Sequence, residues 1–373
     1  MKSTLVNLTN LRKGEFQPNG HLLVRANTIS ESKLESGKNQ VLSAVFGGSV
    51  SSSDGQFSQN RVCFCGQGED CFQLQEVTKI SAFFSIEQSE VARLVVRLLK
   101  IEPKYTIAID RTEWQLGKRW VNVLVLSVTY KSLSIPIFWT VLDEKGCSDN
   151  EERREILEKF IKEFGLENIR FVTADREFCS KEWLAYLIEK RISYRLRIKA
   201  NYQITNAKGE LIRASKLCRT LKIGERRELK GQRKLWSQPV YVAVCKKEDG
   251  DNVLVISSEQ SGKILLEYGE RWKIETLFGV LKTRGFRLED THITEPERVS
   301  KLLSLLTIAL SWAMLAGELE SQAKPLKIKK HGNLEKSIFR LGFEVLRNCF
   351  CQITTNIRQK QRFKQLTLLL SCI

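Results

Sequence analysis

Histidine is scarce in this chain, and no cysteine cluster compensates for it. The 373 residues contain three histidines, none with an evident partner for binding a metal: His21, His292 and His331. The one tight group of cysteines, Cys63, Cys65 and Cys71, lacks the paired C-x-x-C spacing and the fourth ligand of a usual zinc site. We therefore do not expect zinc.

Long apolar runs are also missing. The most apolar uncharged stretch, 302–317, is shorter than the roughly 20 residues that a membrane span needs, so it predicts a buried helix. The N-terminal residues lack the apolar core of a signal peptide. Without such a signal, ten cysteines predict free thiols in a reducing compartment, and hence a cytoplasmic protein without a membrane partner.

Acidic residues are in the minority. Asp and Glu number 43 against 60 Lys and Arg, which gives a formal net charge of +17. A polyanion is the expected partner of such a surface, and nucleic acid is the commonest polyanion. An anionic membrane would also attract it, but the basic residues are spread along the whole chain. A basic surface without a partner stays open as an alternative.

Periodicity divides the chain. Residues 1–85 are rich in Ser, Gly, Gln and Cys and show no sustained period, which predicts loop or disorder. Beyond them, helical and strand patterns alternate, which predicts an α/β fold. We expect helices at 86–99, 148–165, 180–191 and 295–320, and strands at 105–110, 120–130, 135–142, 169–175 and 192–198. The expected units are a catalytic core (86–199 and 262–320), a β-rich insertion (200–261), and a basic linker with C-terminal helices (321–373).

The stretch "YGERWKIETLFGVLK" (268–282) carries a polar stripe on an apolar helix. On a continuous α-helix its polar residues fall within about 60° of one another. They are Tyr268, Arg271, Glu275 and Lys282. A surface ladder of ion pairs favours spacings of three or four, whereas Glu275 and Lys282 are seven apart. The stripe is therefore interpreted as the working face of a site.

Two predicted strands end in aspartates, Asp110 and Asp175. The carboxyl ends of strands are where α/β sheets bind ligands. Either aspartate alone is typical of a strand-end turn, but together with Glu275 they form an all-oxygen set that suits Mg²⁺ or Mn²⁺. Two such ions about 3.5–4 Å apart can activate a water or a 3′-hydroxyl and stabilise the leaving oxygen of a phosphodiester.

Three segments, "IAIDRTEW", "VTADREF" and "YGERWKIETLFGVLKTRGF", resemble the three blocks of bacterial transposases of the "insertion sequence four" kind. The third block has that family's spacing of Tyr, Arg, Glu and Lys. The resemblance extends from about residue 86 to the C-terminus. It implies a DDE transposase with an RNase H-like core, in which Asp110, Asp175 and Glu275 bind two Mg²⁺ (or Mn²⁺) ions.

The same resemblance implies the partners. Tyr268, Arg271 and Lys282 would grip the DNA end near the cleaved phosphate. The substrate would be double-stranded DNA, both as the terminal inverted repeats and as the target. No small-molecule substrate is expected. Movement would be by cut and paste, with a homodimer bridging two ends in the nucleoid region of a bacterial cytoplasm.

Other candidates have a structural alternative of equal or greater weight. Trp236 could stack on a flipped base, although burial habits favour a core or edge-strand tryptophan. Glu113 and Glu177 are expected to pair with Arg111 or Arg176 rather than to bind metal. Five basic residues could each contact a DNA phosphate or equally lie on a solvated face: Arg284, Arg287, Lys230, Arg233 and Lys234.

Residues 1–85 depart from the family pattern, in which basic amphipathic helices read the inverted repeats. We hypothesise that this segment arose from a shifted reading frame or from a fusion. Two further functions therefore stay open, a catalytically inactive DNA-binding remnant and a metal-dependent DNA nuclease. Strand transfer, as opposed to cleavage alone, distinguishes a transposase from a nuclease.

Overall fold

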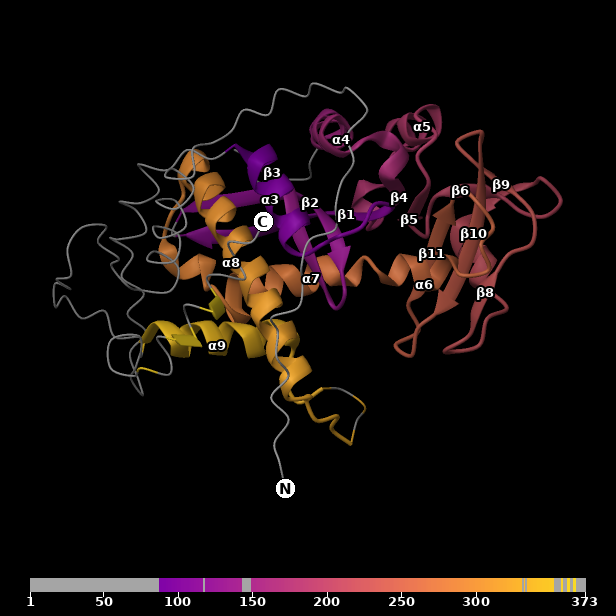
Figure 1. Cartoon of the computed structure of the whole chain (residues 1–373). Helices are drawn as coiled ribbons and strands as arrows, with labels where there is room; N and C mark the ends of the chain where they lie inside the picture. The colour runs from indigo at the N-terminus through magenta and orange to yellow at the C-terminus, as the bar shows by residue number, and fades with distance from the viewer. Residues whose placement is uncertain are drawn as a thin grey trace, which may run out of the picture.

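The computed structural model describes residues 87–330 except 117 and 143–148, together with 332, 334–351, 357, 361–362 and 365–366. The hypotheses about residues 1–85 and the cysteine group lie outside the described residues. In the described parts, the chain forms a mixed α/β fold (Figure 1).

The first half of the fold contains every element predicted before residue 199. These elements are α3 (Gln88–Leu98), β1 (Tyr105–Leu116), β2 (Arg119–Tyr130), β3 (Leu133–Leu142), α4 (Asn150–Phe164), β4 (Ile169–Ala174), α5 (Lys181–Glu189) and β5 (Tyr194–Arg197). Helix α4 begins where the sequence indicates, because Asp149 and Glu152 form a reciprocal capping box. One boundary is wrong: β1 continues to Leu116 instead of ending at Asp110, because its second half pairs with β2 in a long hairpin.

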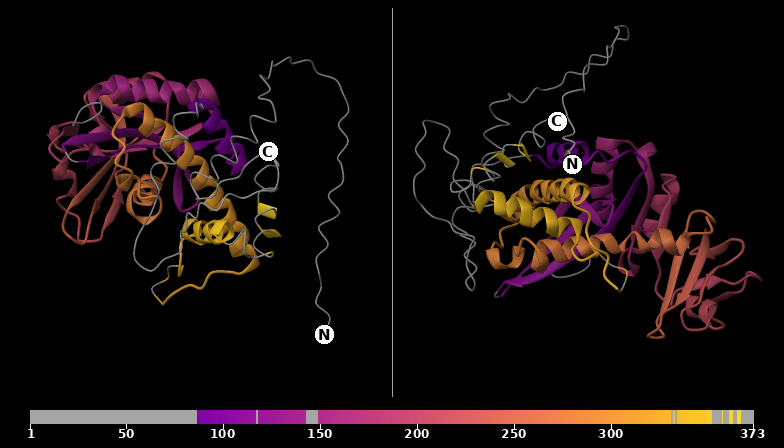
Figure 2. Two further views of the ribbon diagram at one scale, coloured as in Figure 1. Left: turned by 90° about the vertical axis from the view of Figure 1, so that its left-hand side faces the viewer. Right: turned by 60° about the horizontal axis from the view of Figure 1, so that its bottom comes forward.

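Strand β1 occupies the centre of this part of the sheet. It pairs antiparallel with β2 and parallel with β4, so the strand order is β3-β2-β1-β4-β5. Helices α4 and α5 cover one face, and the helices of the second half cover the other (Figures 1 and 2). The central strands are therefore buried on both faces, which explains their continuous apolar character.

The β-rich segment continues the same sheet. Its strands are β6 (Gln203–Thr205), β7 (Leu211–Arg213), β8 (Arg226–Glu228), β9 (Arg233–Leu235), β10 (Gln238–Lys246) and β11 (Asn252–Ser257). Strand β11 pairs antiparallel with β5, and the sheet therefore runs from β3 through β5 into the β-rich segment without a break.

The helices after the sheet are α6 (Ile264–Gly269), α7 (Trp272–Gly279), a π-helical turn (Val280–Arg284), α8 (Pro296–Ala323) and α9 (Ile338–Cys351). Helix α8 is the predicted apolar helix, and 83% of its most apolar 18-residue window is buried inside the protein. It crosses α9 closely at two glycines: a Cβ on Gly342 would lie 1.8 Å from the Ala313 carbonyl oxygen, and one on Gly317 would lie 2.0 Å from that of Ile338. The helix is therefore part of the core.

Candidate active site

The end of the parallel ladder between β1 and β4 brings two aspartates together. The last registered pair is Ile109 with Ala174, and the next residue on each strand is Asp110 or Asp175. Parallel strands in register place equivalent positions side by side, so the two carboxylates meet at this edge although they are 65 residues apart in the sequence. The expected convergence therefore arises from the β1–β4 register.

The guanidinium of Arg271 lies among the carboxylates. Its Nη1 donates to Asp110 Oδ2 at 3.0 Å and its Nη2 donates to Glu275 Oε1 at 2.5 Å. The side chain is only 7% exposed. A buried guanidinium that bridges two carboxylates is a strong, oriented contact, and it fixes the start of α7 over the end of the β1–β4 ladder.

The third carboxylate, Asp175, is tied to the same arginine through a phenol. Tyr268 donates its hydroxyl proton to Asp175 Oδ1 at 3.2 Å, and the hydroxyl oxygen accepts from Arg271 Nε at 3.2 Å. Arg197 on β5 also donates to Asp175, at 3.4 Å. The cluster thus contains three carboxylates, two guanidiniums and one phenol, which we call the carboxylate cluster.

The signature helix is not one continuous α-helix. Helix α6 ends at Gly269, α7 starts at Trp272, and the π-helical turn comes next at Val280–Arg284. Tyr268, Arg271 and Glu275 still share one face, because Glu270 and Arg271 keep helical dihedral angles. The wider π turn rotates the residues within and after it about the helix axis. Three of the four residues predicted to share one face therefore do so, and Lys282 does not.

Lys282 lies in that π turn and contacts β1 beyond Asp110. Its ammonium donates to the backbone carbonyl of Glu113, lies 3.6 Å from Glu289 and sits over the ring of Trp114. It therefore does not join the carboxylate cluster, although it lies along the same strand as Asp110.

Burial and unequal charge shift the acidities in the cluster. Burial raises the pKa of Asp110 to about 7, and the attraction of Arg271 and the Arg111 backbone N–H offset only part of that effect. Asp175 is also partly buried, but the Arg176 backbone N–H and the two guanidiniums outweigh burial and hold its pKa below the usual range. Burial raises the pKa of Tyr268 to about 12. A further positive charge nearby would therefore favour the ionised form of Asp110.

The residues present fit a divalent cation by their chemistry, since the set consists of carboxylate oxygens on adjacent elements. Among the described residues, however, no group of three acidic, histidine or cysteine side chains is close enough to hold a metal ion directly. The guanidinium of Arg271 keeps the carboxylates apart, because it lies between Asp110 and Glu275 and bonds to both. A metal ion between these carboxylates requires that guanidinium to move.

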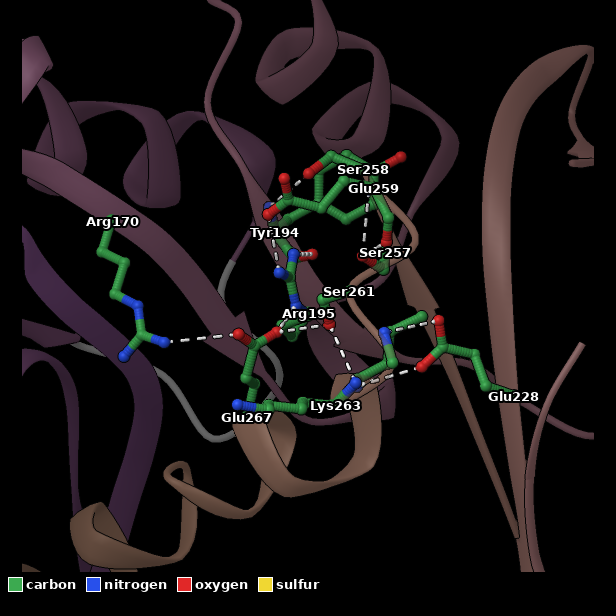
Figure 3. Close-up of polar contacts among 12 residues, drawn as sticks. Arg170, Tyr194, Arg195, Glu228, Ser257, Ser258, Glu259, Ser261, Lys263 and Glu267 are labelled. Atoms are coloured by element: carbon green, nitrogen blue, oxygen red, sulfur yellow. Dashed lines mark hydrogen bonds and ion pairs between the residues drawn. The ribbon is translucent and has the colours of Figure 1, made fainter. Parts of the chain in front are cut away.

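A second buried arginine fixes the opposite side of α6 (Figure 3). Arg195 on β5, 1% exposed, donates to Glu267 at 2.6 Å and to Glu259 at 2.8 Å. Glu267 also accepts from Arg170 on β4 and from Ser261. Glu267 directly precedes Tyr268, so this cluster, which we call the α6 anchor, sets where the tyrosine and the following arginine are held.

The β-rich segment contributes a second anchor. The carboxylate of Glu228, on β8, accepts hydrogen bonds from the backbone N–H groups of Gly262 and Ile264 at the start of α6 (Figure 3). A carboxylate at a helix N-terminus satisfies free donors and complements the helix dipole. The segment predicted as an insertion therefore holds the beginning of the signature helix.

The other predicted residues lie apart from the carboxylate cluster. Trp236 occupies the β9–β10 turn with φ of 52° and packs on Tyr202, with ring centroids 5.0 Å apart. Arg233 is buried and donates to three backbone carbonyls of its own loop, so it is not a phosphate contact. The exposed cations are Lys230, Lys234, Arg284 and Arg287.

Arg111 pairs with both neighbouring glutamates, as expected. It lies 3.1 Å from Glu177 and 3.5 Å from Glu113. The sequence patterns did not single out two further arginines: Arg197, which contacts Asp175, and Arg195, which holds α6. The sequence did contain a signal for them. The two arginines are two residues apart in the otherwise apolar strand "YRLR", so they share one face of the strand and need buried partners.

Comparison with known proteins gives a family match over the same region. The sequence profile described as "Transposase DDE domain" matches residues 101–312, more than half of the chain. No curated protein matches. Among solved structures, the chain is similar to Ciona intestinalis endonuclease V in complex with a 23mer DNA containing an inosine, with 12% identity over 64% of this chain and 100% of that one. The TM-score of 0.27 is too low to establish a shared fold.

Proposed function

This chain belongs to the transposase DDE domain family, and we propose that it is a transposase of the "insertion sequence four" kind. Family membership implies a DNA-cleaving enzyme that acts in DNA transposition. The proposed reaction is metal-dependent cleavage of one strand at an element end, followed by transfer of the freed 3′-hydroxyl to a second strand. The observation that carries the proposal is the gathering of Asp110, Asp175 and Glu275 around one buried arginine.

The proposed core is RNase H-like and comprises 86–199 and 262–320. The strand order β3-β2-β1-β4-β5 and the position of the aspartates at the end of the central parallel ladder support it. The proposed insertion is 200–261. Its pairing with β5 and the contact of Glu228 with α6 give it a supporting role for the signature helix.

DDE transposase domains generally use divalent metal ions. We propose that Asp110, Asp175 and Glu275 hold two Mg²⁺ or Mn²⁺ ions, which would supply Lewis-acid activation of the attacking oxygen and stabilise the leaving oxygen. Without them, Arg271 provides the counter-charge for Asp110 and Glu275. Its withdrawal would open the carboxylates and free a guanidinium that can bind a DNA phosphate bidentately.

The proposed DNA contacts surround that position. Tyr268 would donate to a phosphate oxygen, and Lys282 and Arg284 would follow the strand along the π turn. Trp236, which is partly buried against Tyr202 in the β9–β10 turn, would stack on an unpaired base. The partners would be the inverted repeats and the target duplex, held by a homodimer in the cytoplasm of a bacterium.

The test is cleavage of a labelled duplex that carries the flanking element's own ends. The chain and its Asp110→Ala variant are compared with Mg²⁺ or Mn²⁺. Metal-dependent cutting and joining of the freed end, both absent from the variant, are expected. Cutting without joining would identify a nuclease. Equal, salt-sensitive binding by both proteins without cutting would identify an inactive DNA-binding remnant.

A further inference from the structure

The connection between α8 and α9 doubles back on itself through a single antiparallel β-bridge. Residue Ile328 makes an antiparallel bridge with Leu334, and the Glu335 N–H donates to the Lys327 carbonyl at 2.9 Å. The Gly332 N–H donates to the Lys329 carbonyl, which closes the turn. The described residues of 324–337, which we call the basic ribbon, project from the end of α8 on the side away from α4 and α5 (Figures 1 and 2).

The basic ribbon carries a concentration of positive charge. It has four exposed lysines before its turn: Lys324, Lys327, Lys329 and Lys330. Among the described residues, none of these four forms an ion pair, whereas Lys336 at the base of the ribbon pairs with Glu344 at 2.6 Å. Glu335 is the one acidic residue of the ribbon. Unpaired lysines held close together repel one another and favour an anionic partner.

The two sides of the ribbon differ. Side chains alternate along a strand, so Lys327 and Lys329 share one side and Ile328 lies on the other, opposite Leu334. Ile328 is 71% exposed and Leu334 is 45% exposed. This apolar pair is small, and exposed apolar side chains of this kind are common, so the unpaired lysines are the feature of the ribbon that favours a partner.

We propose that the basic ribbon binds double-stranded DNA outside the carboxylate cluster, with its lysines on phosphates. Lysines act as point charges on phosphates, so the contact positions the duplex and adds little sequence specificity. Ile328 and Leu334, on the side of the ribbon opposite to Lys327 and Lys329, then face away from the phosphates. This inference rests on the proposed DNA-acting function and extends it to a second contact region.

The experiment compares two triple variants that remove equal charge. One is Lys327→Gln/Lys329→Gln/Lys330→Gln in the basic ribbon. The control is Lys159→Gln/Lys162→Gln/Lys181→Gln, which changes exposed lysines of α4 and α5 in the opposite layer. Binding of a fluorescent 40-base-pair duplex (about four helical turns) is measured by anisotropy across a salt titration. Removing one phosphate contact lowers the magnitude of the slope of log K against log salt by about 0.9.

The ribbon variant should reduce that slope by about two to three and bind at least tenfold more weakly at low salt, while the control keeps the wild-type slope. Equal slopes for the ribbon variant and the wild type would overturn the proposal. So would a loss of DNA binding in an Ile328→Ser/Leu334→Ser variant that matches the loss in the ribbon variant and comes with a changed oligomeric state, since the ribbon would then act through a protein contact. A wild-type chain that binds no DNA would instead contradict the proposed function itself.

Discussion

Two buried arginines hold the α6–α7 segment, one on each side, and their surroundings differ. Arg195 in the α6 anchor and Arg271 in the carboxylate cluster are 1% and 7% exposed, and each contacts two carboxylates. The α6 anchor is balanced, since Arg170 and Arg195 face Glu259 and Glu267. The carboxylate cluster has an excess of negative charge, since its three carboxylates share two guanidiniums.

We interpret the balanced cluster as a structural ion pair and the unbalanced one as the proposed cation site. Balanced, hydrogen-bonded charges are satisfied when buried, and they orient the chain. Burial is the main reason that the pKa of Asp110 is raised to about 7, and the neighbouring carboxylates Glu177 and Asp175 add to it, so Arg271 only partly offsets the rise. If one cluster is structural and the other catalytic, the same substitution should mainly affect stability in the α6 anchor and mainly affect DNA cleavage in the carboxylate cluster.

The largest effect is expected on DNA cleavage. Glu275→Gln should lower the cleavage rate by on the order of 10³-fold, because charge stabilisation by bound metal is worth several kcal/mol. Glu267→Gln, the same change in the α6 anchor, should keep the rate within about tenfold when assayed below its unfolding temperature. Equal losses in two folded variants would show that the clusters do not have separate roles. Single-turnover kinetics on a labelled element end measures both rates.

The next effect is on stability. Arg195→Met leaves Glu259 and Glu267 without their buried partner and should cost about 3–5 kcal/mol in urea unfolding. Arg271→Met should cost less, because Asp110 can take up a proton near neutral pH. Adding Glu267→Leu to Arg195→Met should restore part of the stability, since no uncompensated buried carboxylate then remains at that position. A larger cost for Arg271→Met would contradict the comparison.

The pH dependence of stability reports on Asp110 directly. Its pKa rises from 3.8 to about 7 on folding, so between those values the folded protein binds more protons and loses stability as the pH rises. At about 1.4 kcal/mol per unit, the loss is at most about 4 kcal/mol. In EDTA, Asp110→Asn should lack this slope, while Asp290→Asn, on an exposed residue, should retain it. Parallel curves for Asp110→Asn and wild type would be inconsistent with the raised pKa.

A smaller effect is expected on metal binding in the absence of DNA. Arg271→Ala removes the guanidinium that stands between Asp110 and Glu275, so Mn²⁺ should bind about tenfold more tightly, or about 1.4 kcal/mol. Arg284→Ala, on an exposed arginine of the π turn, is the matched control and should leave the affinity unchanged. Titration calorimetry measures both. Unchanged or weaker binding by Arg271→Ala would mean that the guanidinium does not compete with the metal.

The smallest effect concerns the support from the β-rich segment. Glu228→Gln keeps a hydrogen-bond acceptor at the start of α6 but removes the charge that complements the helix dipole. The expected cost is about 0.5–1 kcal/mol, visible as a fall of a few degrees in Tm. A matched Glu225→Gln change, on a partly exposed residue just before β8, should not alter the stability of α6. Hydrogen exchange at the Ile264 amide would show the difference locally.

Much of the fold can be predicted from short-range patterns. The alternation of strands and helices predicted every element between 86 and 199, and the 295–320 helix appears as α8. Two boundaries failed because tertiary contacts decided them. Strand β1 extends past Asp110 where β2 supplies partners, and the signature helix widens into a π turn where Lys282 turns toward β1.

The sequence alone determined which residues could form the site. The spacing of Tyr268, Arg271 and Glu275 places them on one helical face, and two strand patterns followed by aspartates place carboxylates at one edge of a sheet. Only the tertiary structure decided that Arg271 lies between Asp110 and Glu275, and that Arg195 pairs with Glu267 from 72 residues away. The physical reason is range: periodicity records which face a residue occupies within its own element, whereas the balance of buried charge depends on which distant elements pack against that face.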